Sequence, residues 1–122
     1  MVTIKSYGFK FGRPEANIVF DASYFVNPWR HMREIKDTID EPSQIGEAIV
    51  HYMIKQEGVH EFCEKIKDIV LFYDKYFPNE NIQIAVCCSA GEYRSPAIVE
   101  IVKNLLPSNY PITIKHSENS KL

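Results

Sequence analysis

The chain has 122 residues, of which 45% are hydrophobic and 25% are charged, and its formal net charge at pH 7 is −2. These values are typical of a globular domain that buries a core without disulfides or a structural metal, so we expect a single domain over residues 1–122. They exclude a disordered chain, and the absence of a long apolar run excludes a chain that spans a membrane.

The cysteines do not form the pattern of a disulfide framework. There are three of them, an odd number, and Cys87 and Cys88 are adjacent. Their spacing with Cys63 does not match a zinc site, so we expect neither a metal nor a cofactor. Residues 1–5 show no signal-peptide pattern, and free cysteines are typical of a reducing compartment, which together predict a cytoplasmic location.

Charge is distributed unevenly along the chain. Residues 1–33 carry five basic and two acidic side chains, whereas residues 34–80 carry five lysines and eleven acidic side chains. A phosphate-bearing partner should therefore meet the amino-terminal segment and the loop that contains Arg94, and it should avoid the central part of the chain.

The first 40 residues are predicted to form two short strands and two loops. Residues 2–6 alternate between apolar and polar side chains and lead into a glycine-flanked loop at 7–12. Residues 18–20 read as a second strand. The segment 27–33 is predicted to be a loop that is rich in groups able to contact a ligand.

Two amphipathic helices should follow. Ser43 is the expected cap of the first, whose apolar residues recur at helical spacing from Ile45 until Gly58 ends the pattern. A longer stripe of the same kind runs from Val59 to Phe77 and places Cys63 in the core. We interpret both helices as structural.

The stretch from residue 82 to residue 106 predicts a strand, a loop and a helix. Residues 82–87 form a short apolar run, and Ser95 followed by Pro96 is a typical helix start with serine as the cap. A last strand at 112–114 would then pair in parallel through a crossover helix, and residues 117–122 should be frayed. The predicted fold class is α/β, a small sandwich with a mainly parallel sheet of about four strands and three helices.

The loop between that strand and that helix is the predicted functional site. A loop of this kind presents free backbone N–H groups and the positive end of a helix dipole, which favours an oxyanion. Arg94 could grip two oxygens of a phosphate. The loop residues expected to contact the ligand are Cys88, Ser89, Ala90, Gly91, Glu92, Tyr93, Arg94 and Ser95. Neighbouring segments supply four more expected contacts: Lys10, Asn27, Arg30 and His116.

An alternative is a cysteine-dependent phosphatase. Cys88 and Arg94 have the C-x5-R-S spacing of such enzymes, in which the thiolate is the nucleophile. A phosphatase also needs a general acid, and Asp21 and Asp40 are the only candidates in the predicted loops. Glu92 adds a negative charge that would disfavour a thiolate in the loop. The residues therefore favour binding over catalysis.

Four segments, in order along nearly the whole chain, resemble the carboxy-terminal domain of the RapZ family of RNase adapter proteins. They are SYGFKFG at 6–12, VFD at 19–21, NP at 27–28 and AVCCSAGEYRS at 85–95. The resemblance implies a domain that binds an amino-sugar phosphate and, in some members, a small regulatory RNA. Larger members carry a preceding Walker-type domain, but this sequence has no G-x-x-x-x-G-K-[ST] motif, so nucleotide hydrolysis does not carry over.

The loop departs from the family pattern at four positions. Ser89, Ala90, Glu92 and Tyr93 stand where the family usually has threonine, glycine, lysine or glutamine, and histidine. The tail, residues 116–122, has little positive charge, so RNA binding is not expected. We predict a phosphate- or phosphosugar-binding module that acts as a sensor or adapter, with a phosphatase or an RNA-binding adapter as alternatives. A protein partner and a homo-oligomer stay open.

Overall fold

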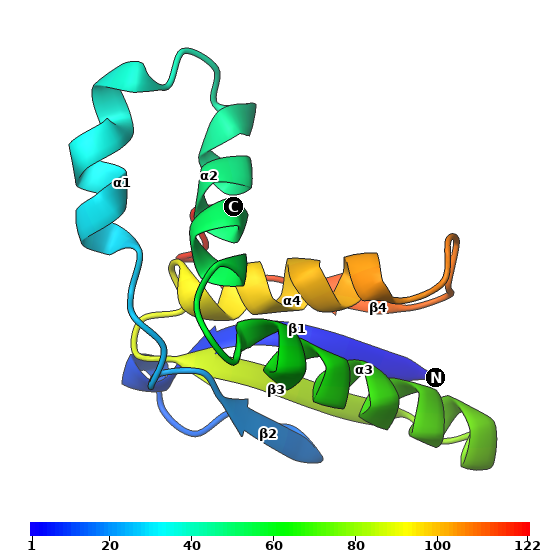
Figure 1. Ribbon diagram of the computed structural model, residues 1–122. Helices are drawn as coiled ribbons and strands as arrows, with labels where there is room; N and C mark the ends of the chain where they lie inside the picture. Colours follow the sequence, from blue (N-terminus) through cyan, green and yellow to red (C-terminus); the bar gives the residue numbers. More distant parts are fainter.

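A computed structural model describes all 122 residues and contains one four-stranded sheet with the strand order β2-β3-β1-β4 (Figure 1). All neighbouring strands are parallel. The strands are β1 (Val2–Gly8), β2 (Ile18–Asp21), β3 (Ile82–Cys88) and β4 (Thr113–Lys115). The long central strands are β1 and β3, and the two short strands form the edges, so the α/β class and the parallel sheet of four strands are confirmed.

The helices number four rather than the three predicted. They are α1 (Trp29–Ile35), α2 (Ser43–Ile54), α3 (Val59–Tyr76) and α4 (Arg94–Leu105), with short 3-10 turns at Phe9–Phe11 and Lys36–Thr38. The additional helix is α1, in the segment 27–33 that was predicted to be a loop. Pro28 precedes it in a helical conformation and its carbonyl accepts from Met32 N–H. With Met32 as its one buried residue, α1 shows no apolar stripe in the sequence.

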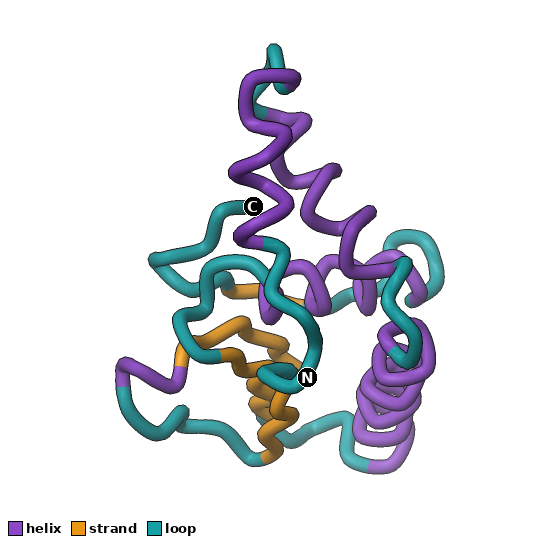
Figure 2. The backbone as a smooth tube through the Cα atoms, turned by 60° about the vertical axis from the view of Figure 1, so that its left-hand side comes forward, coloured by secondary structure: helices purple, strands orange, loops and turns teal.

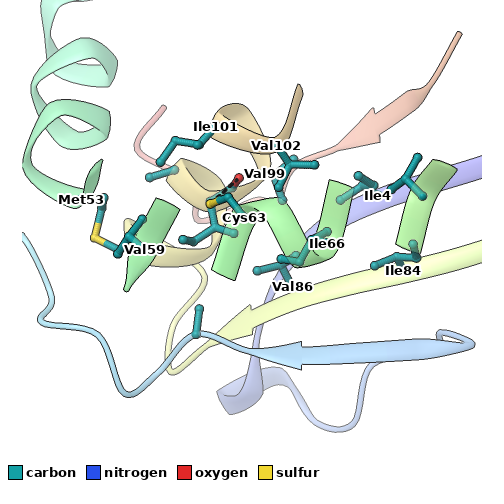
Figure 3. Close-up of a cluster of buried hydrophobic side chains, with 14 of the residues drawn as sticks. Ile4, Met53, Val59, Cys63, Ile66, Ile84, Val86, Val99, Ile101 and Val102 are labelled. Atoms are coloured by element: carbon teal, nitrogen blue, oxygen red, sulfur yellow. Dashed lines mark hydrogen bonds between the residues drawn. The ribbon is translucent and has the colours of Figure 1, made fainter. Parts of the chain in front are cut away.

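The core lies between the sheet and the pair α3 and α4, which both pack on one face (Figure 3). Ile4, Ile84 and Val86 point into it from the strands and are fully buried. Cys63 of α3 is also fully buried, which confirms its predicted place in the core. Burial raises the pKa of its thiol to about 12. None of the helices is long and apolar enough to cross a bilayer.

The opposite face of the sheet is covered by the loop that connects β1 to β2, since no α-helix lies between these two strands. Residues 9–17 leave β1, pass β3 and enter β2 on the far side (Figure 2). Pro14 is buried there, and the carbonyl of Glu15 accepts from Lys5 Nζ at 2.6 Å. Ala85 and Cys87 of β3 are fully buried as a result. Burial raises the pKa of Cys87 to about 11.

Neither predicted serine cap is present. Helix α2 begins at Ser43 itself, and Gln44 Oε1 caps the preceding turn by accepting from the N–H groups of Asp40 and Glu41. In α4 the helix begins one residue before Ser95, whose hydroxyl donates to the carbonyl of Tyr7 instead. Both serines lost the capping role because the chain turns into the helix earlier than the sequence signal indicated.

Helices α1 and α2 form an arm that projects from the rest of the molecule (Figure 1). The chain's carboxyl end returns to this arm, where Leu122 lies beside Gly46 of α2. In the view of Figure 1, the lower ends of α1 and α2 lie near the carboxyl ends of the strands. The loop between β3 and α4 lies at the same end of the sheet.

Candidate oxyanion-binding site

The loop between β3 and α4 lies at the carboxyl ends of the two central strands. Cys88 is opposite Gly8 in the parallel ladder, and Lys10 N–H donates to the carbonyl of Ser89 at 3.0 Å. Ligands in open parallel sheets bind at this edge, outside the carboxyl ends of the strands. The loop is therefore in the position that the sequence predicted for it.

The loop has a series of unused backbone donors. None of the five N–H groups from Ser89 to Tyr93 donates a hydrogen bond to a protein acceptor. Gly91 has a φ of 71°, a conformation that favours glycine and lets successive N–H groups converge. The amino end of α4 follows at once and adds its positive partial charge. Such a set of donors is suited to an anion.

Arg94 lies beneath the loop and is 8% exposed. Its Nη1 donates to the carbonyls of Ser23 at 2.6 Å and Phe25 at 3.1 Å, and its Nη2 donates to Ser89 Oγ at 3.3 Å. Its Nε is buried and has no acceptor. The guanidinium is thus held in place by the segment after β2, and one of its charge-assisted donors has no partner within the protein.

Cys88 is 2% exposed, and the hydrogen bonds of its side chain go to the start of α4. Its Sγ accepts from the Ser95 N–H at 3.4 Å and lies 3.3 Å from Ser95 Oγ. Because the one hydroxyl hydrogen of Ser95 is donated to Tyr7 O, the sulfur must be the donor to Ser95 Oγ in this arrangement. Cys88 is thus hydrogen-bonded twice to Ser95 at the start of α4.

A small cavity of about 110 Å³ lies over the loop. This volume is sufficient for a phosphoryl-sized group. Its lining residues are Asn27, Trp29, Cys88, Ser89, Ala90, Glu92, Tyr93 and Arg94. Burial and the Glu92 charge both raise the pKa of Tyr93, so its hydroxyl stays protonated at neutral pH.

Asn27 is the one predicted contact from a neighbouring segment that the cavity brings to the loop. Lys10 Nζ lies over the Phe11 ring, and Arg30 lines a separate hollow along α1. His116 follows β4 at the expected edge, but its ring bonds Ser6 Oγ and Glu100 Oε2. Within the loop, Gly91 and Ser95 are outside the lining.

The sequence model of one protein family, the RapZ C-terminal domain, matches residues 1–120 of the chain. The chain belongs to the RapZ C-terminal domain family.

Curated relatives of this RapZ C-terminal domain are longer proteins. Three of them, from Bacillus cytotoxicus, Bacillus thuringiensis and Bacillus mycoides, are each named nucleotide-binding protein. Each is 29% identical to the chain over 126 residues, which cover 98% of the chain and 41% of the relative. The chain thus spans about two fifths of the length of the curated relatives it matches.

The carboxyl-terminal tail of the RapZ C-terminal domain is ordered against the loop, contrary to the prediction that it is frayed. Ser117 N–H donates to Ser6 Oγ at 3.0 Å, and Lys121 N–H donates to the carbonyl of Glu92 at 2.9 Å. A Cβ on Gly91 would lie 2.8 Å from Ser117 Oγ. These contacts could not be predicted from the polar composition of the tail, because they are made by backbone groups and one serine side chain.

Three residues of the site were not among the predicted contacts: Ser23, Phe25 and Trp29. Trp29 is 46% exposed at the cavity, while Ser23 and Phe25 act through their carbonyls. A backbone acceptor leaves no signal in the sequence. For Trp29 the available signal was its position two residues after Asn27.

The structure places neither expected general acid at the cavity. Asp21 Oδ1 accepts from the N–H and hydroxyl of Ser23, and Asp40 lines a separate hollow on the arm with Met32. Glu92 is the only carboxylate in the lining. We call the loop 88–95, together with Asn27 and Trp29 at its cavity, the cradle; neither of the expected acids belongs to it.

Proposed function

We propose that the chain binds a phosphorylated small molecule, with the phosphoryl group in the loop between β3 and α4. The observation that carries this proposal is the pairing of five unused backbone N–H groups with the buried, unpaired Nε of Arg94. A buried donor without an acceptor costs about 1–3 kcal/mol, and more when it is charged. A bound oxyanion would remove that cost and satisfy the loop amides at once.

A phosphosugar is the class of ligand that fits best. With the phosphoryl group held by the loop, the rest of the ligand would lie at the mouth of the cavity, where Glu92 and Asn27 offer groups suited to hydroxyls and to an ammonium. An amino-sugar phosphate, the ligand that the family resemblance implies, carries both. On this proposal the module is a sensor or adapter whose partner recognises the ligand-bound form.

The direct test is a calorimetric titration of the protein with glucosamine 6-phosphate, with inorganic phosphate and with glucosamine. Trp29 is the only tryptophan of the chain and lines the cavity, so its fluorescence gives an independent readout. We expect glucosamine 6-phosphate to bind most tightly, phosphate to bind more weakly and to compete, and glucosamine not to bind. Absence of binding by both phosphate compounds would contradict the proposal.

Replacing Cys88 with serine should leave phosphate affinity within about twofold, because the backbone donors and Arg94 do the binding and the hydroxyl is only slightly smaller. Neither wild type nor Cys88→Ser should turn over an aryl phosphate, since neither expected acid, Asp21 or Asp40, lines the cavity and the charge of Glu92 disfavours a thiolate there. Stopped-flow release of the aryl alcohol measures this. A burst in the wild type that Cys88→Ser lacks would favour the phosphatase instead.

A further inference from the structure

A basic surface along α1 adjoins the cradle. Trp29, Arg30, Arg33 and Lys36 line a hollow of about 440 Å³ together with Glu34. None of the three cations has a carboxylate within 4.0 Å, although Glu34 is part of the same lining. The hollow therefore combines unpaired positive charge with an exposed aromatic ring.

Trp29 connects this hollow to the cradle, because it lines both. Its backbone N–H donates to Asn27 Oδ1 at 3.1 Å, which fixes the start of α1 against another residue of the cradle. Arg33 Cζ lies 4.9 Å from the Trp29 ring centroid, a cation–π contact that holds the guanidinium near the shared wall. Arg30 is three residues away on the same helix face.

The two hollows differ in what they can accept. The cradle has room for one phosphoryl group, while the α1 hollow is about four times larger and carries three cations against one acid. A neutral sugar alone would leave those cations without a counter-charge. Two arginines are well suited to oxyanions, because the guanidinium presents paired donors.

We propose that the phosphosugar carries a second anionic group, as an amino-sugar bisphosphate does, and that Arg30 and Arg33 bind this group while the first phosphoryl group lies in the cradle. This inference rests on the proposed function of the cradle. It gives α1 the role of selecting doubly anionic ligands over monophosphates. Trp29 lies between the two anionic groups, against the body of the ligand.

Glucose 6-phosphate and glucose 1,6-bisphosphate form a matched pair for the test, because they differ only in the second phosphate. We expect calorimetry to show about tenfold tighter binding of the bisphosphate, as two charge-assisted contacts at a partly exposed surface would give. The preference should shrink as salt rises from about 20 mM to about 300 mM, since the Debye length falls.

The double variant Arg30→Gln, Arg33→Gln should lose this preference, with the two ligands then binding within about twofold of each other. Both side chains are exposed, so the fold should be retained, which circular dichroism checks. Lys103→Gln is the matched control, because Lys103 is an exposed cation on α4 that lines a different hollow. It should keep the wild-type preference.

The outcomes separate the two proposals. Equal affinity of the wild type for both sugars would overturn the second-anion inference and leave the cradle proposal standing. A preference retained in the double variant would overturn the role of α1. Binding of neither ligand would overturn the cradle proposal itself, and the inference with it.

Discussion

Replacing Arg94 with alanine should abolish measurable phosphate binding and lower the free energy of unfolding by about 2–4 kcal/mol. The side chain donates to the carbonyls of Ser23 and Phe25 and to Ser89 Oγ, and all three partners would lose a charged donor. The carbonyls belong to the segment that leads from β2 into α1, so the arm should loosen too. Denaturant unfolding and calorimetry measure the two effects.

A loss of binding in this variant could come from a disturbed fold, and Arg94→Lys separates the causes. Lysine keeps the buried charge but cannot donate to both Ser23 and the cradle in the fixed fork geometry of arginine. We expect Arg94→Lys to remain folded with phosphate affinity reduced by at least about tenfold. Arg13→Ala, which removes an exposed charge, should change neither quantity. Wild-type phosphate affinity in Arg94→Lys would mean that the guanidinium serves the fold alone.

Replacing Gly8 with alanine should deform the cradle. Gly8 has an ordinary extended conformation, with φ −110° and ψ 126°, so backbone strain is not the reason. A Cβ there would lie 2.5 Å from the carbonyl carbon of Ala90 and 2.8 Å from Gly91 N, and backbone atoms cannot move aside alone. We expect a loss of about 3 kcal/mol in unfolding free energy and phosphate affinity at least about tenfold weaker.

Gly46→Ala is the matched control for this variant. Gly46 is the fourth of the twelve residues of α2, and its nearest contact for a new Cβ is Leu122 at 3.9 Å. Alanine should therefore stabilise the helix by about 0.5–1 kcal/mol and leave phosphate affinity unchanged. Thermal unfolding of both variants gives the comparison. Gly8→Ala with the stability and affinity of the wild type would show that the loop adapts and that its close contact with β1 does not shape the site.

The local part of the site could be predicted from the sequence, because its signals are local. The apolar run before Cys88 and the serine–proline pair after Arg94 mark a strand, a loop and a helix, and this arrangement is confirmed to within a residue or two. The crossover helix also predicted parallel strands, which is confirmed, but the predicted pairing of β3 with β4 is wrong, because β1 lies between them and pairs with both. Cys63 could be assigned to the core because its neighbours repeat at helical spacing.

The remaining features depend on contacts between distant residues. Arg94 is held by carbonyls about 70 positions earlier in the chain, and backbone acceptors have no residue signature. His116 was placed at the correct edge, but its ring turns toward Ser6 and Glu100, which only the packing of α4 on β1 determines. Helix α1 was missed because one buried side chain makes no periodic pattern.

The position of β1 in the sheet has a consequence for how the molecule folds. This strand comes from the first eight residues, yet its partners are β3 at residues 82–88 and β4 at residues 113–115. Neither pairing can form before residues 82–88 or 113–115 have been synthesised, and each must close a long loop against conformational entropy. We therefore expect slow, cooperative folding in which the loop after β3 reaches its final form only once β1 has paired with β3.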